Sequence, residues 1–396
     1  MANELSVAEY APERRQKIAD YVIWTFFILF SLKTITIADK TTPIRLVVYA
    51  LPLFAFVYAA WKPGKIYLNK DVVVALVLMT SACVLSVIFS GRLTSTYAEF
   101  LFLIAAPLCF VVSYKIDNES MKLLAGAVVA LWVQSLIFTP KGSGLGFSLL
   151  ETSGMATEST YCFPLAVITL YFLLSKQYRW GLVMAFVTIL AFKRSAILGI
   201  FLALGAYMIV SRFNLGRSRQ TALWISFSVF IVGGIMALSL VTLFEAVEYT
   251  GSINALTAGR YNVNKLLLML FEQSPAINFL FGHGWGYTTD TIASLTRWGQ
   301  PHNDFFRVML DQGVIGFSLI MAGWVLVLRS GVYTVPLAVL MATFLPFDNT
   351  LIYLHSSLIF VFVANALRQL DEQAGTRVSS SPFVVEDRNA VAAGSR

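Results

Sequence analysis

Apolar stretches of about twenty residues recur along most of the chain, and they constrain its fold more than any other feature. A helix needs about 20 mainly apolar residues to cross the hydrocarbon core of a bilayer. The stretches therefore predict an all-α polytopic membrane protein with about twelve transmembrane helices. The expected spans are residues 18–38, 43–61, 70–90, 97–114, 120–138, 160–175, 178–192, 195–211, 221–244, 307–328, 331–347 and 350–368.

The composition supports a membrane protein and argues against nucleic acid as a partner. Of 396 residues, 57% are hydrophobic and only 13% are charged, whereas soluble domains carry about 25% charged residues. The net charge of +7 is spread between the apolar stretches, which is typical of topology signals and of contacts with anionic lipid headgroups. Cys83, Cys109 and Cys162 all lie inside apolar stretches, so we expect neither a disulfide framework nor a thiolate metal site.

Two long polar segments divide the series of spans. Residues 245–306 form the longer one, which we expect to be a large loop with short helices between nine spans (18–244) and three spans (307–368). Residues 1–17 lack the features of a cleavable signal, and the polar tail 369–396 is expected to be disordered. Because Lys193-Arg194 interrupts the seventh and eighth spans, these form either two short helices with a tight outward turn or a re-entrant pair.

Lysine and arginine are distributed unequally among the short loops. With the N-terminus inside, fourteen basic residues fall on the inner side and seven on the outer side. Because basic residues favour the cytoplasmic side, we expect both termini in the cytoplasm and residues 245–306 outside. The inner residues are Arg14, Arg15, Lys17, Lys62, Lys65, Lys70, Lys115, Lys122, Lys176, Arg179, Arg212, Arg217, Arg219 and Arg329; the outer residues are Lys33, Lys40, Arg45, Arg92, Lys141, Lys193 and Arg194.

Three cations on the outer side stand out. Lys193 and Arg194 lie at an outward turn, against the charge bias. Arg260 begins an amphipathic stretch, where a positive charge opposes the helix dipole. One interpretation is that these side chains simply extend to the water interface. The other is that they bind an anion together with free N–H groups of a helix start.

His302 lies where the long loop meets the tenth span. Pro301 favours a turn, and Asn303 is a good N-cap for a helix that begins at Asp304. Asp304, Arg307 and Asp311 then form a polar stripe at helical spacing. His302 is either a loop residue before a capped helix or a base at the membrane boundary, since histidine titrates near neutral pH.

A glycine-rich segment, Gly282-His283-Gly284-Trp285-Gly286, precedes His302 in the long loop. One interpretation is that its backbone N–H groups bind a phosphate. The other is that the segment is a glycine-rich turn that carries an interfacial tryptophan. His355 lies inside the last span and is expected to be packed or hydrogen-bonded. The outer loops contain no Asp-x-Asp or His-x-x-His pair, so no metal site is expected, and the sequence lacks a phosphate-binding loop for ATP.

Four segments in this order carry a family resemblance. They are Ala191-Phe192-Lys193-Arg194-Ser195-Ala196, Thr257-Ala258-Gly259-Arg260-Tyr261, the glycine-rich segment, and residues 301–316, which begin Pro-His-Asn-Asp-Phe-Phe-Arg. Together they resemble the O-antigen ligase and polymerase superfamily, which contains WaaL-type ligases and Wzy-type polymerases. The resemblance covers roughly residues 180–370. One difference is that Lys193-Arg194 stands where the family more often has Ser-Arg.

The resemblance implies a GT-C-like, metal-independent and inverting glycosyltransferase of the bacterial inner membrane, with no cofactor and with its active site on the periplasmic face. Its partners would be an undecaprenyl-diphosphate-linked glycan, an acceptor, membrane lipids and polysaccharide assembly proteins. His302, Arg260 and Arg194 would be catalytic. The substrate-binding residues would be Lys193, Asn303, Asp304, Arg307, His283 and Gly284.

The acceptor stays open between two enzymes. Asp304 after His-Asn, together with the late segment Phe347-Asp348-Asn349-Thr350-Leu351-Ile352-Tyr353, more closely resembles polymerases of O-antigen or exopolysaccharide, which extend another lipid-linked repeat. A ligase would instead transfer the glycan to lipid A-core. A transporter of lipid-linked sugars also explains the span count, and a scaffold in an export complex would show no turnover.

Overall fold

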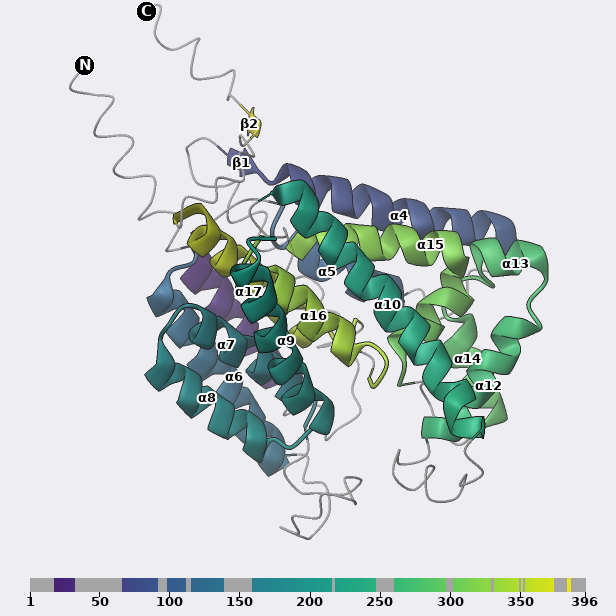
Figure 1. Ribbon diagram of the computed structural model, residues 1–396, viewed down its shortest axis with the longest axis horizontal. Coiled ribbons are helices and arrows are strands. Elements are labelled where there is room, and N and C mark those ends of the chain that lie inside the picture. Colours follow the sequence, from purple (N-terminus) through teal and green to yellow (C-terminus); the bar gives the residue numbers. More distant parts are fainter. Residues whose placement is uncertain are drawn as a thin grey trace, which may run out of the picture.

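The computed structural model describes residues 18–32, 66–91, 98–111, 115–138, 159–215, 218–246, 260–296, 302–328, 331–348, 350–351, 353–373 and 383–385. These residues are almost all helical, so the prediction of an all-α protein is confirmed (Figure 1). The helices are Ile18–Leu32, α4 (Lys70–Ser90), α5 (Ala98–Leu108), α6 (Asn118–Phe138), α7 (Cys162–Leu174), α8 (Tyr178–Leu190), α9 (Arg194–Arg212), α10 (Arg219–Ala246), α12 (Arg260–Glu272), α13 (Ala276–Phe281), α14 (Tyr287–Leu295), α15 (Asp304–Leu328), α16 (Val335–Phe344) and α17 (Leu354–Gln373).

Five of these helices are long and apolar enough to cross a membrane: α4, α6, α9, α10 and α15. Their outer surfaces expose large apolar side chains, among them Val77, Ile137, Phe201 and Ile235. Such extensive apolar exposure is typical of a surface that contacts lipid. Five further apolar helices are shorter, and the expected span at 43–61 lies outside the described residues.

Part of the expected disordered tail is structured. Helix α17 continues to Gln373, and strand β2 (Phe383–Val385) pairs antiparallel with β1 (Ile66–Leu68). In the register, Tyr67 lies opposite Val384. This pairing brings the chain beyond α17 beside the start of α4.

Polar contacts identify one common end for several helices. Arg219, which begins α10, pairs with Asp71 in the first turn of α4. The Tyr171 hydroxyl donates to Asn118 Oδ1 over 2.7 Å and so joins the end of α7 to the start of α6. Lys122 of α6 lies 6.0 Å from the ring centre of Trp180, near the start of α8. These contacts gather helix ends for which the sequence predicts an inner location.

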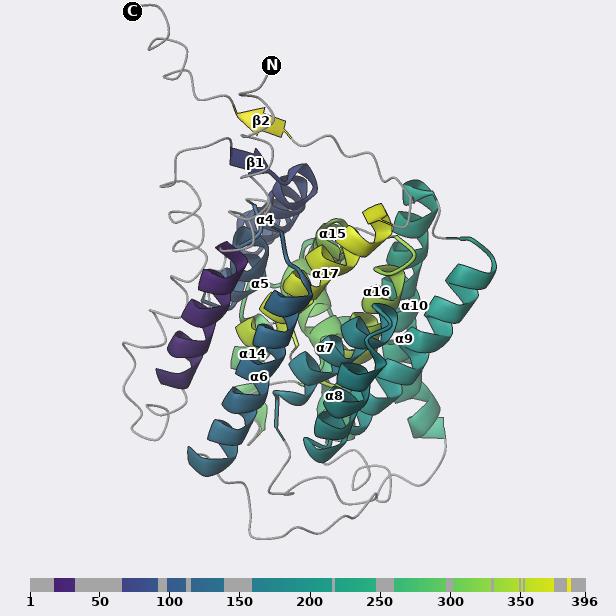
Figure 2. The same cartoon turned by 90° about the vertical axis from the view of Figure 1, so that its left-hand side faces the viewer.

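Helices α9 and α16 run antiparallel and connect this end to the opposite one. At the inner end, the rings of Tyr207 and Tyr333 stack with their centres 5.7 Å apart. At the opposite end, Lys193 contacts Asp348. The turn at 191–193 joins α8 to α9, of which α9 is long and apolar enough to cross a membrane and α8 is shorter. Figure 2 shows these helices side by side.

Helix α15 packs along α4 but is broken at Gly313 (Figure 1). The φ and ψ angles of Gly313 are 67° and 179°, which no helix can contain. Helix α15 matches the expected span at 307–328 and is long and apolar enough to cross a membrane, but it contains this break, where α13 meets α15. A Cβ atom at Gly313 would lie 2.3 Å from the carbonyl oxygen of Leu280, so only glycine permits this approach of two backbones.

Candidate functional site

The turn that carries His302 is shaped by its neighbour in the sequence. The Asn303 side chain accepts a hydrogen bond from the N–H group of Phe306 over 3.1 Å, so the predicted N-cap is confirmed. His302 itself has a φ of 50°, in the left-handed region that few non-glycine residues adopt. Such backbone conformations cost energy and are concentrated at functional sites.

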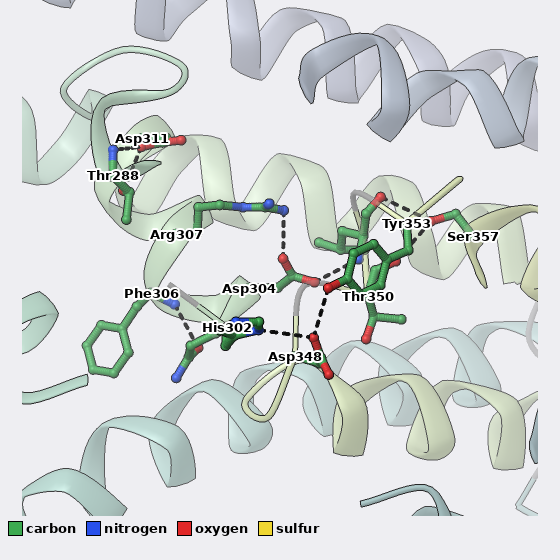
Figure 3. Close-up of polar contacts among 12 residues, drawn as sticks. Thr288, His302, Asp304, Phe306, Arg307, Asp311, Asp348, Thr350, Tyr353 and Ser357 are labelled. Atoms are coloured by element: carbon green, nitrogen blue, oxygen red, sulfur yellow. Dashed lines mark hydrogen bonds and ion pairs between the residues drawn. The ribbon is translucent and has the colours of Figure 1, made fainter. Parts of the chain in front are cut away.

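Asp348 is the centre of a polar cluster on the turn between α16 and α17 (Figure 3). Its carboxylate is 1% exposed. Oδ1 lies 3.3 Å from Nδ1 of His302 and accepts a hydrogen bond from the Tyr353 hydroxyl over 3.3 Å, while Oδ2 pairs with Lys193 Nζ. Three elements distant in sequence therefore meet at one buried carboxylate, and the His302 side chain remains 28% exposed.

Asp304 holds the turn that presents Asp348. Its N–H group donates to the carbonyl oxygen of Leu345 over 2.8 Å, and its Oδ2 accepts from the N–H group of Leu351 over 2.7 Å. These two bonds flank Asp348 in the sequence and fix the turn against α15. The second carboxylate oxygen of Asp304 lies 2.6 Å from Arg307 Nη2.

Asp304 and Arg307, which the sequence analysis expects to bind substrate, form a buried ion pair in the structure. Both are buried, with 0% and 2% of their side chains exposed, so no substrate reaches them in this arrangement. Buried charges are normally paired, and here the pair stabilises the junction between α15 and the 345–351 turn. The substrate-binding role expected for Asp304 and Arg307 stays a prediction.

The start of α15 is anchored to the middle of α10 by a small-residue contact. A Cβ atom at Gly233 would lie 3.1 Å from Cζ of Phe305, and one at Gly234 would lie 3.5 Å from Cδ1 of the same ring. Gly233 is fourteen residues into α10, which spans Arg219–Ala246. His302 thus lies close to a segment packed halfway along a long apolar helix.

Lys193 and Arg194 occupy the start of α9. Lys193 is the N-cap residue and lies 4.7 Å above the ring centre of Phe163 in addition to its pair with Asp348. Arg194 is the first helical residue and is half-buried. A helix start carries partial positive charge from its free N–H groups, so this end of α9 favours an anion.

The residue after His302 also contacts α12. The side-chain amide of Asn303 donates to Oδ1 of Asn264 over 3.4 Å. Arg260 begins α12 four residues before Asn264, and residues four apart share a helix face. The backbone of α12 thus places position 260 one turn from the contact with Asn303, while the Arg260 side chain lies outside the described residues.

The glycine-rich segment turns out to bind an internal carboxylate. Asp311 accepts from the N–H groups of Gly286 (3.0 Å) and Thr288 (2.8 Å) and from the Thr288 hydroxyl (2.6 Å). The N–H groups of His283 and Gly284 donate to the carbonyl oxygens of Leu310 and Asp311. Because α15 is broken at Gly313, these carbonyls are available to the loop rather than to the helix.

The substrate-binding role expected for His283 and Gly284 stays a prediction. Their N–H groups already donate within the protein. The His283 ring stacks on Tyr287 with centres 4.2 Å apart and its Nε2 lies 2.8 Å from Ser274 Oγ. His355 is packed, as expected, with its ring 4.9 Å from that of Tyr161 and 5.6 Å from that of Tyr353.

The structure thus joins two of the predicted residues, Lys193 and His302, through a residue to which the sequence analysis gave no role. Asp348 had one available signal, a carboxylate inside an otherwise apolar region, which often marks a functional site. Among the described residues, no group of three or more His, Cys, Asp or Glu side chains is placed to hold a metal ion.

Comparison with protein-family models finds no model that matches the chain, and comparison with curated proteins finds no match. The family resemblance of the four segments therefore stays a prediction. The geometry of the cluster around Asp348 carries the functional argument that follows.

Proposed function

We propose that this protein is an inner-membrane glycosyltransferase that polymerises undecaprenyl-diphosphate-linked oligosaccharide repeats on the periplasmic face. The observation that carries the proposal is the contact of His302 with a buried carboxylate that also holds Lys193. A histidine oriented by a carboxylate is a general base. Cations beside it are suited to a diphosphate leaving group.

The reaction assigns each group a defined task. The Nδ1–H group of His302 donates a hydrogen bond to Asp348 and keeps its proton. Nε2 is then free to accept the proton of the acceptor hydroxyl. The hydroxyl oxygen attacks the anomeric carbon, the bond from that carbon to the diphosphate oxygen breaks, and the lipid diphosphate leaves with the electron pair. Attack opposite the leaving group inverts the configuration. Arg194 and Arg260 stabilise the negative charge that grows on the diphosphate.

The location of the cluster supports this proposal. Lys193 and His302 lie at the helix ends opposite those of Arg219 and Asp71. The distribution of lysine and arginine places the helix ends beside Arg219 in the cytoplasm, together with both termini. In this orientation the cluster around Asp348 faces the periplasm. The proposed fold is GT-C-like with about twelve spans. The proposal requires no metal ion and no cofactor.

Two other functions make different predictions. A ligase would use the same cluster but transfer the glycan to lipid A-core. A transporter of lipid-linked sugars would move its substrate unchanged, and it leaves the pairing of His302 with Asp348 without a chemical task.

One reconstitution experiment separates these functions. Purified protein in liposomes receives lipid-diphosphate-linked oligosaccharide, with or without lipid A-core, and the products are resolved by mass. Lengthened glycan with release of free lipid diphosphate supports the polymerase. Product that appears only on lipid A-core assigns a ligase, and unchanged substrate in every arm would sink the enzymatic proposal.

A further inference from the structure

The short helix α13 exposes apolar side chains on a segment of the long loop. Ile277, Phe279 and Leu280 are 46%, 40% and 41% exposed. The helix contains no charged residue and follows the exposed polar pair Glu272-Gln273. Exposed apolar groups of this size on a short segment need a partner.

The position of α13 against α4 indicates what that partner is. Phe281, the last residue of α13, stacks on Phe89 of α4 with ring centres 3.9 Å apart. Phe89 and Ile88 are 44% and 66% exposed and end a row of outward-facing side chains that runs along α4. The exposed surface of α13 therefore continues the apolar surface of a helix long and apolar enough to cross a membrane.

The length of α4 sets the depth of this patch. Its 21 residues extend about 31 Å at the helical rise per residue, close to the thickness of about 30 Å for a hydrocarbon core. Phe89 is the penultimate residue of α4, so the stacked Phe281 lies near the boundary of the core. The start of α4, beside Arg219, is at the opposite boundary.

The patch is also held rigidly. A Cβ atom at Gly282 would lie 2.2 Å from the carbonyl oxygen of Asp311, and one at Gly313 would lie 2.3 Å from that of Leu280. This reciprocal contact clamps the end of α13 onto the break in α15. The exposed side chains of α13 are thus presented at a fixed depth.

We propose that α13 is an interfacial helix whose exposed side chains Ile277 and Leu280, three positions apart on one face, are inserted among the acyl chains of the leaflet at the end of α4. Apolar faces of this kind enter the boundary between headgroups and acyl chains by about 5–10 Å. The long loop is then tied to the bilayer beside α15, the helix that follows His302. This inference rests on exposure and position and does not depend on glycosyl transfer.

Spin labelling tests it on the full chain. Cys83, Cys109 and Cys162 are buried, so a nitroxide reagent reaches mainly an introduced cysteine. Ile277→Cys and Leu280→Cys are labelled in liposomes of phosphatidylethanolamine and phosphatidylglycerol, beside Val77→Cys on the exposed face of α4 and Asp290→Cys on the exposed face of α14. Collisions with oxygen and with a water-soluble nickel chelate are then compared.

The proposal predicts that the labels at 277 and 280 collide more with oxygen than with the nickel chelate, as the label at 77 does. The label at 290 shows the reverse preference. A preference for nickel at 277 and 280 would place α13 in water and overturn the proposal. Protection from both reagents would also overturn it, because protein rather than lipid would then cover the patch.

Discussion

Nδ1 of His302 lies 3.3 Å from Oδ1 of Asp348, and the other oxygen of that carboxylate pairs with Lys193. The three residues come from the turn before α15, the turn after α16 and the start of α9. The buried carboxylate of Asp348 thus orients the imidazole of His302 and also fixes the position of the Lys193 ammonium group. Each of these functions can be tested separately by substitution.

The orientation of His302 is tested by Asp348→Asn. The amide preserves the shape of the side chain but removes the charge that stabilises a protonated imidazole. We expect glycosyl transfer to fall by about 100-fold or more, while binding of the lipid-linked donor is retained. Rates are measured per amount of folded protein, and full activity in this variant would remove Asp348 from the mechanism.

The ion pair between Lys193 and Asp348 is tested through stability. Lys193→Met leaves a carboxylate that is 1% exposed without its cation, and loss of one partner of a buried pair costs about 3–5 kcal/mol. We expect a clear fall in the melting temperature in detergent. The double variant Lys193→Met with Asp348→Leu should recover much of the loss, and equal instability of both proteins would refute a coupled pair.

The contacts of Asp311 are tested by Asp311→Asn. The carboxylate accepts three hydrogen bonds from Gly286 and Thr288, and bonds to a charged acceptor contribute about 1.5–3 kcal/mol each. We expect faster proteolysis within 282–296. Asp290→Asn, at an exposed position of α14, is the matched control. Equal cleavage of the two variants would show that the hydrogen bonds to Asp311 do not hold this segment in place.

The helix break at Gly313 is tested by Gly313→Ala. The added Cβ would lie 2.3 Å from the carbonyl oxygen of Leu280, and the φ of 67° is strained for alanine. We expect little folded protein by size-exclusion chromatography. Gly126→Ala and Gly205→Ala, where a Cβ atom meets nothing within 4 Å, should fold normally, since alanine is favoured over glycine inside helices.

Local features of this chain follow directly from its sequence. The cap at Asn303 depends on a residue three positions away, and five helices long enough to cross a membrane coincide with expected apolar spans. The turn between α8 and α9 coincides with Lys193-Arg194, because charged residues interrupt the apolar pattern there. These features are set by neighbours in the sequence, so they can be predicted from it.

Features that depend on distant segments could not be predicted. Lys193 and Asp348 are 155 positions apart, and nothing in either neighbourhood identifies the other. The break at Gly313 lies inside a stretch long enough for a single span, and it coincides with the approach of the Leu280 backbone, which is 33 positions away. For the same reason, helical spacing places Asp311 in a polar stripe with Asp304 and Arg307, whereas in the structure its carboxylate accepts hydrogen bonds from the glycine-rich segment and Thr288.

The role of His302 as the base is the central claim, and a single-turnover measurement tests it most directly. Reconstituted wild-type or His302→Ala protein is mixed with radiolabelled lipid-diphosphate-linked oligosaccharide, with the protein in molar excess over this substrate. The formation of lengthened glycan is then followed. We predict that the substitution lowers the rate constant by about 100-fold or more while the protein melts at nearly the wild-type temperature. A rate constant equal to that of the wild-type protein would contradict the account.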